Sequence, residues 1–489
     1  ALSIYQEMQE NTETHPNEYA FVSLLKACRI MKDMGKGHEI HGHIVKVGLM
    51  RKNVFICSAL IDMYAKCGHM VKAQEIFNQI EIRNVVSWTS LISGYVENGC
   101  IDTAMDCFER MQGEGIQPDA FTLVCILKAC AMVGDLDKGQ EIHIEIARQG
   151  LLERNLYIGS ILIDMYIKCN SLSKAREVFD NLSIRNVVSW NAIIAGYAEC
   201  GDAARALDLL KRIGNEGLSG DALTLVCCVK ACGAAGFIDN GRELHGEIIQ
   251  KGFLESDMFS GGALVDMYAK CGCLHESCVV FESLPFRTIV SWNAIIAGHA
   301  EYGYGEELAF SYFELMQHEG ISPDEITFLG ILKACGSLRV KSKVLRMHSE
   351  IARRGLETQL LIGNSLVDMY AKVGSLVEAQ EVFDKLSVQT VISWTTLITG
   401  YVEQKKGKEA IHCLKLMQFR DISMNAISSI CGLRACSSVG NIYMGQELHA
   451  EIIIKGLIDS HFLTIGSSLV DMYAKCGMLE EAHDMHNKI

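Results

Sequence analysis

Apolar residues recur along this chain every three to four positions, which is the spacing of amphipathic helices. In residues 85–119, a first apolar series runs from Trp88 to Tyr95 and a second from Ala104 to Met111. Glycine and proline residues separate the two series and end the second. No stretch alternates convincingly with period two, so the pattern predicts pairs of short helices and little or no strand.

The pattern returns at a fixed distance along the chain. The four tryptophans, Trp88, Trp190, Trp292 and Trp394, lie 102 residues apart. A period kept this strictly indicates a repeat array. Each block divides into three units, and each unit contains two predicted helices. Because a lone helix pair cannot bury its apolar stripe, we expect an all-α solenoid of stacked helix–turn–helix units that forms one continuous array.

Hydroxyl residues stand near the predicted start of each first helix. Ser87 precedes Trp88, and we expect its side chain to be the N-cap. The same role is expected for the equivalent residues Ser189, Ser291, Ser393, Thr122, Thr224 and Thr327.

Composition agrees with a helical array. The chain has 489 residues, of which 49% are hydrophobic, but it has no run of about 18 apolar residues and therefore no expected membrane span. Nine of its 20 cysteines occupy two equivalent positions of the repeat, and Val373 takes the place of a cysteine at one of them. We therefore expect small buried side chains in a reducing compartment, with no disulfide framework.

A His-x-Glu pattern is the one candidate for catalysis. It occurs at His143/Glu145, His245/Glu247, His348/Glu350 and His449/Glu451. This is half of the zinc-deaminase signature, but the Pro-Cys-x-x-Cys half is absent. Its return once per block favours a packing role, so we expect no catalytic residue, metal or cofactor. A deaminase built on one such motif stays open as an alternative that requires bound zinc.

The units, with their Trp, Gly-Tyr and closing Pro-Asp, resemble the pentatricopeptide repeat (PPR) family in its plant PLS subclass. Trp88-x-x-Leu91-x-x-Gly94-Tyr95 differs from the spacing of the related tetratricopeptide repeats. The resemblance covers essentially all of residues 1–489 and implies a right-handed superhelix. The assigned units are 1–17 (partial P), 18–53 (L), 54–84 (S), 85–119 (P), 120–155 (L), 156–186 (S), 187–221 (P), 222–257 (L), 258–288 (S), 289–324 (P), 325–359 (L), 360–390 (S), 391–425 (P), 426–462 (L) and 463–489 (partial S).

What the resemblance implies is single-stranded RNA binding along the concave face, with one base per unit. In the family, the fifth and the last residue of a unit meet beside one base. The P-unit pairs here are Thr89/Asp119, Asn191/Asp221, Asn293/Asp324 and Thr395/Asn425, and the S-unit pairs are Ser58/Asn84, Ser160/Asn186 and Asn364/Thr390. Apolar second residues, Val86, Val188, Val290 and Ile392, are expected to sandwich the base.

These pairs vary between blocks but use only Ser, Thr, Asn and Asp. The alternative is a solvated helix position followed by a cap. By similarity to the family's code, Thr/Asp implies G, Asn/Asp implies U, Thr/Asn or Ser/Asn implies A, and Asn364/Thr390 implies a pyrimidine. Ser467 alone stands for the last purine, Gly262/Thr288 is unassigned, and the L units carry aliphatic fifth residues. The implied target is 5′-NAGNAUNNUNYANR-3′.

Net charge is the main objection, because it is −14 whereas RNA-binding proteins are usually basic. One lysine at position 13 of each S unit provides candidate phosphate contacts: Lys66, Lys168, Lys270, Lys372 and Lys475. The alternative is a solvated lysine at a helix end, where cations are favoured anyway.

Family resemblance also implies a role in C-to-U editing of plastid or mitochondrial transcripts, with the deamination done by a DYW domain in cis or trans. No such domain lies in these residues, so this fragment is expected to bind RNA and not to be an enzyme. Because both ends fall within a unit, we expect a piece of a longer protein whose organelle-targeting peptide is not included. A splicing or stability factor and a tetratricopeptide-like protein scaffold stay open.

Overall fold

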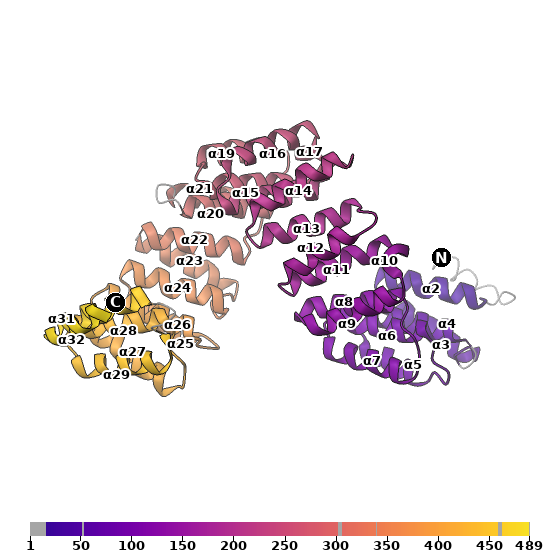
Figure 1. Ribbon diagram of the computed structural model, residues 1–489, viewed down its shortest axis with the longest axis horizontal. Coiled ribbons are helices and arrows are strands. Elements are labelled where there is room, and N and C mark those ends of the chain that lie inside the picture. Colours follow the sequence, from indigo (N-terminus) through magenta and orange to yellow (C-terminus); the bar gives the residue numbers. More distant parts are fainter. Residues whose placement is uncertain (1–15, 51–52, 302–305, 339, 458–461, 489) are drawn as a thin grey trace. The chain divides into compact units, whose positions relative to one another are not determined.

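A computed structural model describes residues 16–50, 53–301, 306–338, 340–457 and 462–488 (Figure 1). These residues form helices and no strand, which confirms the predicted all-α fold class. The predicted partial unit at 1–17 lies almost entirely outside the described residues. None of the described helices is both long and apolar enough to cross a membrane.

The chain divides into two compact halves, residues 1–231 and 232–489, with the boundary inside α15 (Ala222–Ala235). The sequence predicted one continuous array, and we describe each half by itself. The N-terminal half contains α2 (Glu18–Met31), α3 (Met34–Lys46), α4 (Val54–Lys66), α5 (Met70–Asn78), α6 (Val85–Glu97), α7 (Ile101–Gly113), α8 (Ala120–Val133), α9 (Leu136–Arg148), α10 (Leu151–Arg154), α11 (Leu156–Lys168), α12 (Leu172–Asn181), α13 (Val187–Glu199) and α14 (Ala203–Asn215).

The C-terminal half repeats the same order of helices. It contains α16 (Ile238–Gln250), α17 (Phe253–Ser256), α18 (Met258–Lys270), α19 (Leu274–Ser283), α20 (Ile289–Glu301), α21 (Glu306–His318), α22 (Glu325–Leu338), α23 (Lys341–Arg353), α24 (Leu360–Val373), α25 (Leu376–Lys385), α26 (Val391–Glu403), α27 (Gly407–Phe419), α28 (Ala426–Val439), α29 (Ile442–Ile454), α31 (Phe462–Lys475) and α32 (Leu479–Lys488).

Within each half, the first helices of successive units pack against one another and form a row. In the N-terminal half this first-helix row is α2, α4, α6, α8, α11 and α13, and in the C-terminal half it is α18, α20, α22, α24, α26, α28 and α31. Most first helices also pack on the second helix of their own unit. This is the stacking of a solenoid, in which each unit completes the core of its neighbours.

In the described part of the chain, two L units contain a short third helix that the sequence pattern did not predict. Gly150 and Gly252 end α9 and α16 in the left-handed conformation, with φ of 63° and 68°. The next four residues then form one helical turn, α10 or α17, before the following unit begins. Glycine permits this reversal because it has no Cβ.

The predicted N-caps are wrong by one turn. Helix α6 begins at Val85, and its N-cap is Asn84, whose side chain accepts a hydrogen bond from Ser87 N at 3.0 Å. The Ser87 hydroxyl in turn accepts from Asn84 N at 3.1 Å, which makes a capping box. The apolar residue Val85 already belongs to the helix, so the cap must precede it. The other six predicted caps are wrong in the same way, because the backbone N–H of each donates to the side chain of the residue three positions earlier. The pairs of predicted residue and observed cap are Thr122 and Asp119, Ser189 and Asn186, Thr224 and Asp221, Ser291 and Thr288, Thr327 and Asp324, and Ser393 and Thr390.

The repeating tryptophans join successive units. All four are at most 2% exposed, and each lies edge-on to a phenylalanine from the preceding S unit, with ring centroids 4.5–4.7 Å apart. Such pairs add to the burial of apolar area. The strict period of 102 residues therefore reflects a core contact that occurs once per block.

Two glycines at close helix contacts predict stability effects of different size. A Cβ added at Gly94 would lie 2.6 Å from Ala65 Cβ, which is fixed to the backbone of α4. A Cβ at Gly139 would meet Met165 Sδ at 2.5 Å, and that flexible side chain can move aside. Since Gly→Ala itself favours a helix, we expect Gly94→Ala to lose about 1–2 kcal/mol and Gly139→Ala to be near neutral. Urea unfolding of the two variants measures this, and equal effects would contradict it.

Candidate nucleic-acid interface

The last residue of a unit lies at the start of the next first helix, as the caps above establish. The fifth residue lies in the preceding first helix, so the two members of each predicted pair lie on neighbouring stacked helices. Ser58, Ser160, Asn191, Asn293 and Thr395 are at most 8% exposed. These five fifth residues are therefore not solvated helix positions, as the alternative explanation of the pairs required.

Two P units bring the predicted pair into direct contact. Asn191 Nδ2 donates to both carboxylate oxygens of Asp221, at 3.0 and 3.1 Å. Asn293 Nδ2 makes the same two bonds to Asp324, at 3.0 and 3.2 Å. The buried amide thus holds in one orientation the carboxylate of the last residue of its own unit, at the start of the next first helix.

A threonine completes each of these pairs, and the sequence analysis assigned it only to capping. Thr327 Oγ1 donates to Asn293 Oδ1 at 2.6 Å and lies 2.8 Å from Asp324 Oδ1, and Thr327 N donates to the same carboxylate oxygen at 2.9 Å. Thr224 contacts Asn191 and Asp221 in the same way. The signal was present in the sequence as a threonine three positions after each Asp.

These bonds also affect the ionisation of Asp221. Partial burial by itself would raise the pKa of this carboxyl, but the hydrogen bonds from Thr224 and Asn191 outweigh it, and the pKa lies below its usual range. At neutral pH the unit therefore presents an anionic acceptor that is fixed by neighbouring donors.

The remaining P-unit pairs are linked differently. Thr89 Oγ1 lies 2.6 Å from Thr122 Oγ1, which lies 2.8 Å from Asp119 Oδ1, so Thr122 bridges the pair. Thr395 Oγ1 instead donates to Val391 O at 2.6 Å, while Asn425 caps α28. The structure therefore joins three of the four P-unit pairs.

In the S units, the structure shows no hydrogen bond between the two described members of any pair. Ser58 Oγ donates to Val54 O at 2.9 Å, whereas Asn84, Asn186 and Thr390 act as caps. Ser160 Oγ and Asn364 Oδ1 are buried with no partner in the described part of the chain. Ser467 Oγ donates to Thr464 O at 3.1 Å.

Second residues form an apolar surface on the first-helix rows. Val86, Val188, Val290 and Ile392 are 40%, 53%, 49% and 64% exposed, as a base-sandwiching role requires. The same position in L and S units is also exposed and often aromatic, which the sequence analysis missed. These residues are Tyr19, Phe55, Phe121, Tyr157, Leu223, Phe259, Ile326, Leu361 and Ile427. The signal that identifies them is their place two residues after each cap.

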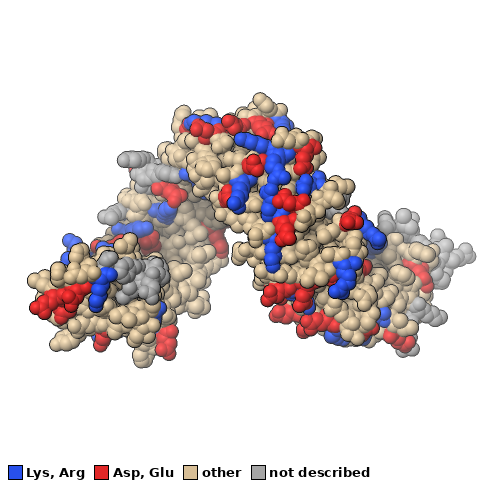
Figure 2. Space-filling model, in the orientation of Figure 1, with Lys and Arg blue, Asp and Glu red and all other residues tan. Residues whose placement is uncertain are grey.

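Carboxylates lie beside all five candidate phosphate-binding lysines. Lys168, Lys270, Lys372 and Lys475 pair with the aspartate one turn earlier, at 2.6–2.9 Å, and Lys66 pairs with Glu97. Figure 2 shows the same mixing of signs elsewhere, with basic and acidic side chains interspersed on the face in view. These ion pairs compensate much of the positive charge that would attract phosphates.

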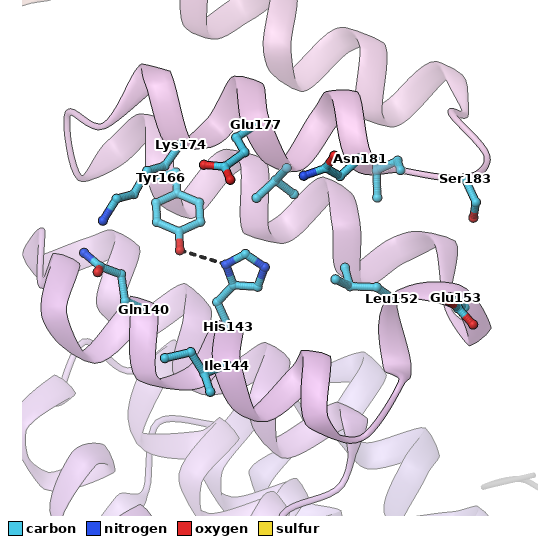
Figure 3. Close-up of a pocket in the computed structure, with 12 residues that line it drawn as sticks. Gln140, His143, Ile144, Leu152, Glu153, Tyr166, Lys174, Glu177, Asn181 and Ser183 are labelled. Carbon is cyan, nitrogen blue, oxygen red and sulfur yellow. Dashed lines mark hydrogen bonds between the residues drawn. The ribbon is translucent and has the colours of Figure 1, made fainter.

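Within a His-x-Glu motif, the histidine and the glutamate contact different residues. His143 Nδ1 is 2.9 Å from Tyr166 Oη at the edge of a cavity of about 400 Å³ (Figure 3), while Glu145 pairs with Arg148 at 2.8 Å. Equivalent His–Tyr bonds of 2.7–3.0 Å occur at His41, His245, His348 and His449. Within the described ranges, no three His, Cys, Asp or Glu side chains are grouped as metal ligands.

Four half-buried histidines predict a loss of stability in acid. Burial lowers the pKa of His41, His143, His245 and His449 below the ordinary value of 6.5. Below that pH the unfolded chain binds more protons than the folded chain, so the free energy of unfolding falls as the pH falls towards the folded-state pKa. We expect the change in urea midpoint between about pH 7.5 and pH 5 to shrink when these four residues become Gln. An unchanged pH dependence would contradict this.

Comparison with known proteins finds the same repeat. Profiles described as "PPR repeat family" match residues 83–132 and 287–337, and those described as "PPR repeat" match 55–85, 160–187, 188–218, 364–388, 392–422 and 467–489. A chloroplastic pentatricopeptide repeat-containing protein of Arabidopsis thaliana is 31% identical over 488 residues, covering 97% of this chain and 54% of the relative. A mitochondrial one is 33% identical over 469 residues, covering 96% and 45%. The chain spans about half the length of these curated relatives.

Solved structures give the same fold. The crystal structure of the pentatricopeptide repeat protein PPR10 from maize is similar with a TM-score of 0.64 and 20% identity, over 100% of this chain and 75% of that chain. A structure of a PPR10 variant in complex with an 18-nucleotide psaJ RNA element has a TM-score of 0.63 and 19% identity, over 99% and 75%.

Proposed function

This chain belongs to the pentatricopeptide repeat family, and from that premise we propose that it binds single-stranded RNA sequence-specifically, one base per unit. The observation that carries the proposal is the Asn–Asp contact of two P units, at 3.0 Å in Asn191/Asp221 and in Asn293/Asp324. A buried amide and an oriented carboxylate leave few rotamers to order on binding. The PPR10 variant in complex with RNA supports the same class of ligand.

The chemistry of the pairs supports base readout. An ionised carboxylate accepts hydrogen bonds only, so Asp119, Asp221 and Asp324 would accept from a base N–H. The fifth residue then distinguishes the units, as Thr in one and Asn in two. Exposed second residues, such as Val188 and Val290, would cover the faces of the base. With the S-unit pairs and Ser467, the proposed target is 5′-NAGNAUNNUNYANR-3′.

Salt dependence should be moderate. A phosphate contact to Lys168, for example, must compete with Asp164, which lies 2.9 Å from the ammonium group. Affinity would then rest more on stacking and base contacts than on counterion release.

We further propose that the array, as a PLS-type array, is the site-recognition part of an organellar C-to-U RNA editing factor. The curated relatives named as chloroplastic or mitochondrial support an organellar location. Deamination would be carried out by a DYW-type domain, in the same protein or in a partner. A splicing or transcript-stability factor would use the same RNA-binding surface.

A second candidate function is a tetratricopeptide-like scaffold for proteins. The observation that favours it is the net charge of −14, which opposes RNA binding in general. Such a scaffold would bind peptides and be indifferent to RNA sequence.

A binding titration at fixed salt tests the proposal. The ligand is an RNA of the proposed sequence, and the comparison RNA is altered at the G of unit 85–119 and at the U of unit 187–221. We expect the two changes to weaken binding by about 1–3 kcal/mol each. Equal weak binding to both RNAs would reject sequence-specific binding and favour the scaffold.

A further inference from the structure

A cysteine, a histidine and a tyrosine meet in the third block, away from the base-reading pairs. Cys278 on α19 is partly exposed, and its Sγ lies 3.3 Å from Nε2 of His299 on α20. Tyr312 on α21 donates its hydroxyl to the same sulfur at 3.4 Å. Its ring stacks on His299, with centroids 5.4 Å apart. One sulfur is therefore held between a nitrogen base and a hydrogen-bond donor.

The other blocks show what this cluster replaces. At the equivalent positions, Tyr95 Oη donates to Gln74 Oε1 at 2.8 Å, and Tyr401 Oη donates to Gln380 Oε1 at 3.2 Å. A neutral Gln–Tyr bond thus serves the fold in two blocks. The third block has changed both partners to groups that exchange protons, so packing by itself does not require the thiol and the imidazole.

His299 is suited to accept the thiol proton. Its side chain is 3% exposed, and burial lowers its pKa below the ordinary value of 6.5, so the imidazole is neutral at physiological pH. A neutral imidazole has one nitrogen that accepts a proton, and in the tautomer that carries its hydrogen on Nδ1 this acceptor is Nε2, which faces the sulfur. The Tyr312 hydroxyl stabilises the negative charge that develops on the sulfur as the proton leaves.

Most other cysteines are protected from reaction. Burial raises the pKa of the Cys130, Cys335 and Cys436 thiols to about 12, and that of Cys232 to about 11. Since the thiolate is the nucleophile, such groups are inert. Cys100 and Cys200 are exposed and provide internal standards for an ordinary accessible thiol.

We propose that Cys278 is a modification site, a nucleophilic thiol that His299 and Tyr312 activate towards peroxides and soft carbon electrophiles. With hydrogen peroxide, the sulfur attacks one oxygen, so that an S–O bond forms as the O–O bond breaks. The thiol proton passes to His299 Nε2 and then to the departing oxygen, which leaves as water. The sulfur is oxidised to a sulfenic acid and the peroxide is reduced. This inference is independent of RNA binding.

Site-resolved labelling of the intact chain tests it. Iodoacetamide is added for increasing times, and peptide mass spectrometry gives the alkylation rate at each cysteine. A parallel series uses hydrogen peroxide with dimedone to trap the sulfenic acid. We expect Cys278 to react roughly tenfold faster than Cys100 and Cys200, although it is less exposed. A rate at or below those of the two exposed cysteines overturns the proposal.

Two variants separate activation from accessibility. His299→Gln removes the proton acceptor, and Tyr312→Phe removes the donor while it keeps the ring. Both variants should slow labelling at Cys278 and leave the labelling rates of Cys100 and Cys200 unchanged. Unchanged rates at these two cysteines also indicate that the fold is intact. An unchanged rate at Cys278 in His299→Gln overturns the assigned role. The double change Cys278→Gln with His299→Tyr restores the pair of the other blocks, and it should keep the thermal midpoint and abolish the rapidly labelled site.

Discussion

Changing Thr89 to Asn is expected to move the preferred base of unit 85–119 from guanine to uracil. The unit 187–221 already carries the resulting arrangement, because Asn191 faces Asp221 and Thr224. Unit 85–119 has Asp119 and Thr122 at the equivalent positions. The new amide therefore meets the same acceptor and the same hydroxyl, and a repacking of the core is not required.

The expected size of this change is about 1–3 kcal/mol in relative affinity for the two bases. It is measured by titrating the wild type and Thr89→Asn with RNAs that differ only at this base. A variant that still prefers guanine would contradict the assignment of Thr89/Asp119 to base readout.

Two control variants identify the cause of the switch. Ser90→Asn places the same amide one position further along α6 and should leave the base preference unchanged. Thr122→Val keeps the side-chain shape but removes the hydroxyl between Thr89 and Asp119, whose atoms it contacts at 2.6 and 2.8 Å. We expect it to reduce discrimination at this base only. Weaker binding to all RNAs would instead indicate a loss of structure.

Truncating a repeating tryptophan should cause the largest loss of stability. Trp190 is 0% exposed and packs edge-on against Phe179 with centroids 4.7 Å apart. Trp190→Ala leaves a cavity between two units, and we expect it to cost about 3–5 kcal/mol. Urea unfolding followed by circular dichroism measures the loss. Hydrogen exchange should place it in residues 172–215, because each unit of an array depends on its neighbours.

A milder substitution separates packing from hydrogen bonding. Trp88 Nε1 donates to Glu114 at 3.3 Å, whereas Trp190 Nε1 is buried without a partner in the described structure. We therefore expect Trp88→Phe to cost about 0.5–1.5 kcal/mol more than Trp190→Phe. Equal costs would show that the indole N–H of Trp88 contributes nothing.

Much of the fold followed from periodicity alone. The spacing of apolar residues predicted paired helices, and the four tryptophans predicted the block length, because a residue that fills the same core contact in each block must recur at a fixed distance. The exact residues at which the helices begin did not follow from periodicity. Ser87 carried a capping signature, yet Asn84 is the cap, since Val85 joins the helix through packing that a short sequence window does not contain.

The candidate site shows the same division. Sequence and family resemblance named Asn191 and Asp221 as a pair, but the 3.0 Å contact, the burial of the amide and the part of Thr224 depend on two helices that stack side by side. The lysines looked free in the sequence, and the structure places a carboxylate beside each, for example Asp164 beside Lys168. Distances across a helix turn or between units depend on side-chain directions, which a residue pattern does not specify.

The sequence by itself determined that this protein is an array of paired helices, because burying a periodic apolar stripe leaves a chain of such units no other stable arrangement. Only the tertiary structure decided which polar side chains are held in position by hydrogen bonds, and which lysines have their charge compensated by a neighbouring carboxylate. Hydrogen bonds between neighbouring helices, such as those of Asn293 with Asp324 and of His299 with Cys278, join residues 31 and 21 positions apart. Such contacts exist only once neighbouring helices are packed, and the base readout and thiol reactivity proposed for this protein depend on them.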